Sequence, residues 1–395
     1  MMAETWLMEL ANGIGRFFLN PIVYWAIILS IAVGYKRIKK ERKHFGLKVF
    51  DVLSEWKNTW FVSLIFGLVI SFISIGAGMV FSYETIILIA VVTILLSMSI
   101  RFTMLSPGYT IGITYLLMFL SPFVLTYQSI IDSNLFADPN FTGLCLLLAI
   151  LLSAEAFLLR WHRRNNTFPD MKPSPRGTWI GVHHLKKVTL IPFFVLIPTG
   201  SITSFAAFWP YFSVNGETYS LVLVPFLLGF DHVVKGDLPE KAAARLARSM
   251  HILSLIVLFM AIGSIYIGWL SLAAVLVGII GREYFSYRHR LADHEKTPFF
   301  HQHERGMKVL AVIPGTPADR LGISIGETIV KVNGKKIDSM DSFYYALQES
   351  GAFFKLEIIG DNGEVRFVQS ALYEEDHHEL GIIMTKKPYL DNKLA

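Results

Sequence analysis

The chain has 395 residues, of which 53% are hydrophobic and 17% are charged, and its mean hydropathy is +0.48. Soluble domains carry about 25% charged residues, so this composition excludes an ordinary soluble enzyme and favours a membrane protein with several spans. The net charge of +5 comes from basic residues that lie between apolar runs, which indicates membrane topology rather than nucleic-acid binding.

Apolar runs of about the 20 residues needed to cross a bilayer recur up to residue 281, and we predict about eight spans. The first run, at 14–34, lacks the basic start and cleavage site of a signal peptide and is expected to be retained. Because it contains Asn20-Pro21, residues 5–34 also allow an interfacial helix followed by one span. The stretch at 251–281 is too long for one untilted helix, so we expect two short helices or a re-entrant pair bent near Gly268-Trp269. The remaining spans are expected at 58–79, 84–104, 109–127, 141–160, 188–210 and 219–234.

The segments between the spans differ in charge. Residues 35–57, 160–187 and 235–250 are rich in Lys and Arg, whereas 127–140 and 210–220 contain neither. Cytoplasmic loops carry the excess of basic residues, so the first three segments and the C-terminal tail are expected in the cytoplasm.

Ionisable residues inside apolar spans are candidates for function. Glu155 is expected near Arg160, about one turn away, at the end of its span. Asp231 and His232 follow Pro225 and Gly229, so they are compatible with a broken helix or a proton site, but a structural or interfacial role is favoured because a basic segment follows closely. The single cysteine, Cys145, lies in an apolar run and is expected to be a core thiol.

The sequence changes character from about residue 291, where histidines and charges precede alternating apolar residues with turn signals. MKVLAVI at 307–313 alternates as a strand, and Asn333-Gly334 is typical of a hairpin turn. These features predict a soluble domain of roughly 90 residues with several strands and two helices. The predicted division is a membrane region at 1–281, a basic and histidine-rich linker at 282–304, the soluble domain at 305–388 and a tail at 389–395.

The soluble segment contains a series of short motifs. PGTPA at 314–318 is followed by LGI at 321–323, GETI at 326–329 and VNG at 332–334. In order and spacing this series resembles a bacterial PDZ domain, with Glu327 in place of the commoner aspartate. The fold class implied is a polytopic α-helical membrane bundle followed by a small β-rich α+β PDZ domain.

The PDZ resemblance also implies a peptide-binding groove, in which an extended segment adds as a strand beside a helix. The glycine-containing loop is expected at Glu379-Leu380-Gly381, and the acidic first residue makes an internal peptide segment as plausible as a free C-terminus. The alternative interpretation is that Leu380 and Ile382 are only core strand residues. The predicted groove residues are Leu380, Gly381, Ile382 and Ile383 on the strand, and Phe343, Tyr344 and Leu347 on the helix.

Motifs of membrane proteolysis are absent from the sequence. A zinc protease needs His-Glu-x-x-His on a helix, and neither His303-Glu304 nor HHEL at 377–380 completes that pattern. Rhomboid Gly-x-Ser-Gly and Walker sequences are also missing. His294, His301 and His303 do not have the spacing of a helical ligand pair, so we expect a solvated linker, no metal, no cofactor and no enzymatic activity.

A multispan region followed by one PDZ domain, with GIGRFFLNPIVYW and the basic YKRIKKERKHF near the start, resembles the MinJ family of cell-division topology proteins. The resemblance implies a scaffold at the cell membrane, enriched at septa and poles, that bridges the polar protein DivIVA and the ATPase MinD. Other division proteins and membrane lipid are further expected partners, and nucleic acid is not. Alternatives from other classes are a PDZ-containing regulator of membrane proteolysis and a transporter that uses Asp231 and His232.

Overall fold

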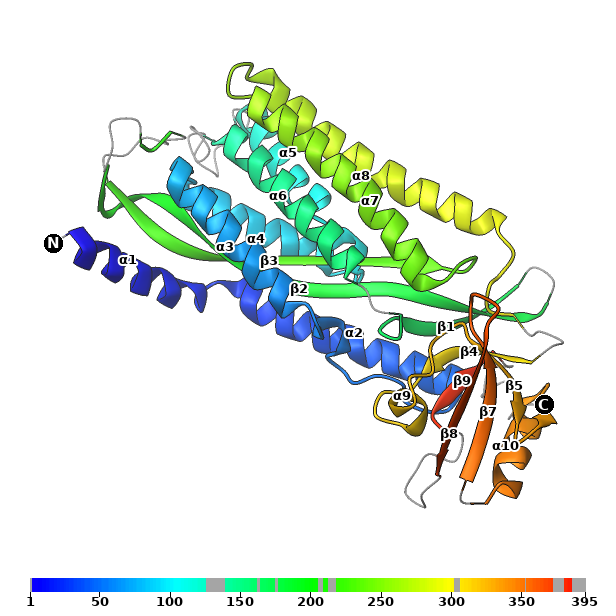
Figure 1. Ribbon diagram of the computed structural model, residues 1–395. Coiled ribbons are helices and arrows are strands. Elements are labelled where there is room, and N and C mark those ends of the chain that lie inside the picture. Colours follow the sequence, from blue (N-terminus) through cyan, green and yellow to red (C-terminus); the bar gives the residue numbers. More distant parts are fainter. Residues whose placement is uncertain are drawn as a thin grey trace.

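The structure is a computed structural model in which an elongated bundle of helices carries a small sheet domain at one end (Figure 1). This architecture confirms the predicted class, a helical membrane region followed by a strand-rich domain. The predicted tail at 389–395 lies outside the described residues. The described residues are 2–125, 139–161, 164–174, 177–204, 209–211, 218–301, 306–351, 353–371 and 380–385.

Within that described part of the chain, six helical segments are long and apolar enough to cross a membrane. The first of them joins α1 and α2, and a shorter apolar helix, α4, lies beside them. The count of about eight spans is therefore approximate. The helices of this region are α1 (Met2–Phe17), α2 (Pro21–Phe45), α3 (Trp60–Ala77), α4 (Tyr83–Ser97), α5 (Pro107–Leu125), α6 (Phe141–Arg160), α7 (Pro239–Gly263) and α8 (Trp269–Glu295).

Two breaks occur where the sequence predicts them. The Asn20 side chain accepts a hydrogen bond from the Ile22 amide, and Pro21 occupies the first turn of α2, so α2 starts as a separate helix. The stretch at 251–281 divides into α7 and α8, which confirms the break near Gly268-Trp269, but the two helices have 25 and 27 residues and are not the short helices predicted. Both helices continue into the basic segments on either side, so α8 includes much of the segment predicted as a linker.

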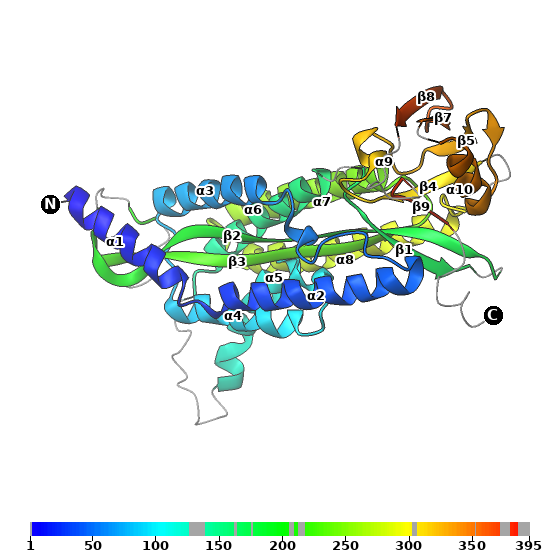
Figure 2. The ribbon, with the colours of Figure 1, turned by 90° about the horizontal axis from the view of Figure 1, so that it is seen from below.

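Two predicted helical spans are wrong. Residues 188–210 and 219–234 belong to two long antiparallel strands, β2 (Trp179–Thr203) and β3 (Thr218–Val234), and β1 (Phe168–Pro173) pairs with the start of β2. The β2–β3 hairpin runs lengthwise through the middle of the bundle (Figures 1 and 2). Each strand still runs along the bundle once. The basic segments at 160–187 and 235–250 therefore remain at one end of the bundle and the segment at 210–220 at the other, as the prediction of eight spans requires.

The composition of the hairpin explains the error. A strand that is buried on both faces has a continuous apolar sequence, which periodicity alone does not distinguish from a buried helix. Pro192 and Pro225 are the distinguishing signal, because proline in a helix interior removes a hydrogen bond and clashes with the preceding turn. The two prolines face each other across the ladder.

Helix α3 supplies hydrogen bonds to the outer edge of β2. The Ser63 hydroxyl donates to the Leu190 carbonyl, and the Phe194 amide donates to the Ser71 hydroxyl over 2.9 Å. Backbone groups of alternate strand residues point to the same edge of the strand, and Pro192 lies two residues from both Leu190 and Phe194. The N–H group that proline lacks would therefore point to this outer edge. Unpaired backbone groups are costly in apolar surroundings, and these contacts satisfy two of the groups on this edge.

Gly67 lies between Ser63 and Ser71 on the same face of α3, and a Cβ at this position would collide with the Pro192 carbonyl oxygen. We expect Gly67→Ala to force α3 away from β2 and to lower the free energy of unfolding by about 1–3 kcal/mol, the usual range for overpacking. Gly76→Ala is the matched control, because nothing lies within 4 Å of its Cβ and alanine favours helix more than glycine does. Thermal unfolding in detergent micelles, followed by tryptophan fluorescence, measures both, and equal midpoints would contradict close packing at Gly67.

The C-terminal domain begins at residue 306 and contains a sheet with the strand order β8-β7-β5-β4-β9, with β6 paired to β5. Its core is a separate cluster of buried side chains that includes Val309, Ile329, Phe343 and Leu356. The elements are β4 (Met307–Val312), α9 (Pro317–Arg320), β5 (Thr328–Val332), β6 (Lys335–Lys336), α10 (Met340–Glu349), β7 (Phe353–Ile359), β8 (Val365–Ala371) and β9 (Ile382–Met384).

Candidate functional site

The candidate site lies between β9 and α10 of the C-terminal domain. Strand β9 is the last strand of the sheet and pairs antiparallel with β4, and among the described residues no strand pairs with its other edge. Helix α10 starts at a capping box, in which the Ser339 and Ser342 side chains each bond the other residue's backbone amide. An open strand edge and a well-anchored helix are the two parts that strand addition requires.

The structure brings the predicted strand and helix residues together. Leu380, Ile382, Phe343 and Leu347 all belong to the one core cluster of this domain. Their side chains are at most 2% exposed, so they form the inner wall of the site rather than its accessible surface.

Tyr344 is the one predicted groove residue whose side chain is partly exposed. Its hydroxyl accepts a hydrogen bond of 2.6 Å from the Gln348 amide, one turn further along α10. The neighbouring Tyr345 is 63% exposed. Tyr344 is therefore the side chain of this set that is best placed to contact a bound peptide.

The loop before β9 has a backbone conformation that glycine favours. Leu380 and Gly381 have φ values of 55° and 78°, and their carbonyls accept hydrogen bonds from the Ala318 and Ile313 amides. A Cβ on Gly381 would collide with the Thr316 side chain, so a substitution here would damage the fold of the domain as well as any groove. Glu379, the acidic residue expected in this loop, lies outside the described residues.

Ile383 points away from the core cluster that contains its neighbours. It belongs to an apolar cluster, here called the docking cluster, that joins the C-terminal domain to the membrane region. Phe300 lies at its centre, where its side chain is fully buried and its ring centroid is 4.7 Å from that of His183 on β2. The buried members of the docking cluster are Phe45, Val49, Phe50, Phe168, Met171, Phe300, Leu310, Ala311, Ile325 and Ile383.

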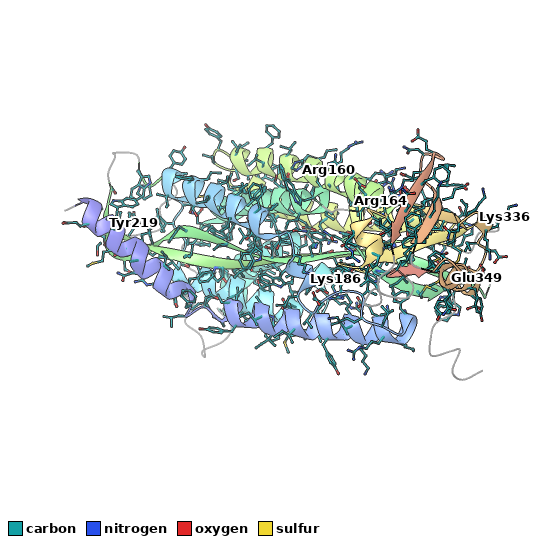
Figure 3. The ribbon with its side chains drawn as sticks, turned by 60° about the horizontal axis from the view of Figure 1, so that its bottom comes forward. Arg160, Arg164, Lys186, Tyr219, Lys336 and Glu349 are labelled. Atoms are coloured by element: carbon teal, nitrogen blue, oxygen red, sulfur yellow. The ribbon has the colours of Figure 1, made fainter. Side chains whose placement is uncertain are left out.

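Polar contacts surround the docking cluster. The Gly181 amide of β2 donates to the Phe300 carbonyl over 2.9 Å. Asn165 bonds two backbone groups of the C-terminal domain, the Ile323 carbonyl and the Ile325 amide, both over 3.0 Å. Arg164 donates to the Ile325 carbonyl and pairs with Asp361 over 3.2 Å, and Figure 3 shows it beside the strands of that domain. No sequence motif marks these residues, because each contacts residues more than a hundred positions away.

Asp231 and Glu155, two ionisable residues that the sequence marks as candidates, have ionisable partners in the structure. Asp231 and His232 lie on β3, so a broken helix at this point is wrong, and the Asp231 carboxylate is 2.8 Å from His184 Nδ1. Glu155 faces Arg282 of α8 at 3.7 Å rather than Arg160. His303 lies outside the described residues, and within those residues no group of three or more His, Cys, Asp or Glu side chains has a metal-binding arrangement.

Comparisons with known proteins cover both parts of the chain. Residues 308–357 match the family model of the PDZ domain. The cell division topological determinant MinJ of Bacillus subtilis is 35% identical over 399 residues, which is 100% of this chain and 99% of the relative. A probable cell division topological determinant MinJ of Lacticaseibacillus paracasei is 22% identical over 393 residues, or 93% and 96% of the two chains. A putative protease Do-like 14 of Arabidopsis thaliana shares 46% identity over 43 residues, 11% of this chain.

Proposed function

Since the chain belongs to the MinJ family of cell division topological determinants and therefore acts in the selection of the division site, we propose that it does so as a non-enzymatic membrane scaffold. In this proposal the scaffold bridges a DivIVA-like polar coiled-coil protein and a MinD-like ATPase. The bridge restricts assembly of the division ring near poles and completed septa, where the protein is enriched.

The observation that carries the proposal is the attachment of the PDZ domain to the membrane region. Phe300 and the docking cluster fix the domain against β1 and β2 at one end of the bundle. A partner that is itself confined to the membrane or to the pole then meets the groove at a raised effective concentration, so weak peptide contacts suffice. Rigid attachment also fixes the direction from which a partner approaches.

The charge pattern supports a cytoplasmic position for this domain. The basic segments at 35–57, 160–187 and 235–250 adjoin α2, α6 and α7 at the end of the bundle that carries the PDZ domain (Figure 1). By the positive-inside rule we expect this end, and with it the PDZ domain, to face the cytoplasm.

We propose that the bound segment is an extended peptide that adds to the free edge of β9 and lies against α10. Backbone hydrogen bonds from the strand edge would supply affinity, and Tyr344 would contact peptide side chains. The buried residues Leu380, Ile382, Phe343 and Leu347 hold the two walls in place.

The test uses the tagged full-length chain in Bacillus subtilis cells that lack their own MinJ. We expect the wild type to collect at septa and poles and to recover DivIVA and MinD on purification. Tyr344→Ala should reduce recovery of the peptide-bound partner up to about tenfold, the usual range for a tyrosine at the centre of an interface.

Tyr345→Ala is the matched control, because it removes the same side chain from the adjacent, more exposed position on α10. An even membrane distribution of the wild type would contradict the scaffold. Equal losses from the two tyrosine variants would contradict the groove while leaving the scaffold intact.

A further inference from the structure

A cavity of about 210 Å³ lies at the PDZ-side end of the bundle, between α2, β1, the start of β2 and the end of β3. Five basic side chains line it: Lys36, Arg37, Lys40, Arg101 and Lys186. They come from α2, from the residue that precedes the short 3-10 helix Phe102–Leu105, and from β2. Three separate elements therefore contribute positive charge to one partly open cavity.

Two of these cations already have carboxylate partners. Arg37 pairs with Glu41 at 2.5 Å and with Glu55 at 2.9 Å. Lys40 pairs with Asp170 at 2.5 Å. These two side chains form part of the wall of the cavity, here called its frame. Because carboxylates already neutralise them, they contribute little attraction for a bound anion.

The carboxylates of the lining are also neutralised. His184 bridges Asp170 and Asp231, with 2.8 Å between His184 Nδ1 and Asp231 Oδ1, and His44 contacts Asp170 at 2.9 Å. Burial raises the pKa of Asp170, but hydrogen bonds from His184, His44 and Lys40 outweigh it and hold that pKa well below the ordinary value. Asp170 is therefore ionised and fully engaged within the frame.

Three cations remain outside direct ion pairs, and one of them, Lys186, lies opposite Asp231 across the β2–β3 ladder and is attracted by it. Among the described residues, Lys36, Arg101 and Lys186 have no carboxylate oxygen within ion-pair distance. Lys186 is held between the hairpin and α2 (Figure 3), with its ammonium 4.8 Å from the centre of the Phe102 ring. Lys36 and Arg101 are exposed, so water screens part of the repulsion, and the repulsion that remains among the three cations favours binding of an anion.

The surroundings of the cavity indicate where that anion comes from. Val33 and Ile100 contribute apolar surface to the lining itself. Toward the middle of the bundle, α2 and α4 lie side by side (Figure 2) and expose large apolar side chains, among them Ile31 at 50% and Leu95 at 60%. A ligand in the cavity therefore adjoins surface that acyl chains cover.

We propose that this cavity binds the phosphate of an anionic phospholipid headgroup, with the acyl chains against α2 and α4. Arg101 offers a planar guanidinium that bonds phosphate oxygens in pairs, and Lys36 and Lys186 act as point charges. Basic pockets at the cytoplasmic side of membrane helices are suited to such headgroups. The site goes beyond the proposed scaffold function and does not depend on it.

The test measures binding of phosphatidylglycerol to the full-length protein in neutral detergent micelles by native mass spectrometry. We expect one tightly held phosphatidylglycerol and no comparable binding of zwitterionic phosphatidylcholine. Substituting Lys36, Arg101 and Lys186 together by glutamine should weaken that binding by at least about tenfold. Each basic residue near the membrane surface contributes a similar amount to the affinity for anionic lipid, and this variant removes three of them.

The matched control replaces Lys39, Arg42 and Lys43 by glutamine, which removes the same charge from exposed positions of α2 that do not line the cavity. The control should bind within about twofold of the wild type, because its three side chains do not line the cavity. Equal weakening in both variants would overturn the proposal in favour of general surface attraction.

Two further arms complete the experiment. The double variant Lys36→Gln/Arg101→Gln changes only exposed side chains, so it tests the site even if the triple variant does not fold. The cavity could also bind free inorganic phosphate, which is therefore added as a soluble competitor. Displacement of the lipid by inorganic phosphate at a similar concentration would overturn the assignment to a lipid headgroup.

Discussion

Replacing Glu155 by alanine is expected to lower the free energy of unfolding of the membrane region by about 3–5 kcal/mol, because it leaves a buried charge without its partner. Arg282 is 2% exposed, and its guanidinium lies 3.7 Å from the Glu155 carboxylate. The same carboxylate accepts a hydrogen bond of 2.5 Å from the Ser106 hydroxyl. The substitution therefore removes contacts that join α6 to α8 and to Ser106, the residue before α5.

Thermal unfolding in detergent micelles measures this loss. The double variant Glu155→Leu/Arg282→Met should recover most of the stability, since removing both charges leaves no unpaired ion. Glu283→Ala is the matched control on α8, because the two contacts it removes, with Arg290 and with the Tyr109 hydroxyl, are both exposed, and an exposed ion pair is expected to contribute at most about 1 kcal/mol. If Glu155→Ala unfolded at the same temperature as Glu283→Ala, the buried pair would contribute no more to stability than the exposed contacts.

Phe300→Ala is expected to release the PDZ domain from the membrane region. Truncation of a fully buried phenylalanine costs about 3–5 kcal/mol, and here the loss falls on the docking cluster rather than on the core of either part. Hydrogen exchange in the full-length chain provides the measurement. The amides of Gly181 and Ile325, which bond across the contact, should exchange faster.

The amides of β5 and β7 distinguish undocking from unfolding. They lie in the centre of the domain sheet and should keep their protection in Phe300→Ala. Phe367→Ala is the matched control, because Phe367 is 62% exposed on β8. Unchanged exchange at Gly181 and Ile325 in Phe300→Ala would show that Phe300 does not hold the two parts together.

The helical spans were predictable because length and composition are sufficient for them. The prediction of 141–160 coincides with α6, and 58–79 and 109–127 differ from α3 and α5 by a few residues. A helix satisfies its own backbone hydrogen bonds, so its stability in lipid depends mainly on its own sequence.

The hairpin was not predictable in the same way. A strand depends on a partner for its hydrogen bonds, and β2 finds its partners in β3 on one side and in Ser63 and Ser71 of α3 on the other. Nothing within 188–210 itself identifies those distant residues. The prolines at 192 and 225 were the available signal against helices. The prediction of helical spans followed the length of the apolar runs instead.

The two elements of the candidate site were predictable, and the peptide-binding role of its residues stays a prediction. Local motifs placed β9 and α10 correctly, and four of the predicted groove residues lie in one cluster. Which of these side chains is accessible depends on packing. The structure was therefore needed to show that Tyr344 is the partly exposed one. The role of Ile383 in docking also depended on tertiary contacts.

The sequence by itself determined the membrane class, most of the spans, the charge asymmetry and the PDZ domain, because each of these depends on local composition, spacing or turn chemistry. The tertiary structure decided which apolar runs are strands, how the PDZ domain is attached and which cations surround the cavity. The physical reason is that strand pairing, docking and ion pairing join residues far apart in the chain, such as Glu155 with Arg282 and Gly181 with Phe300, and a single sequence carries no local signal for those pairs.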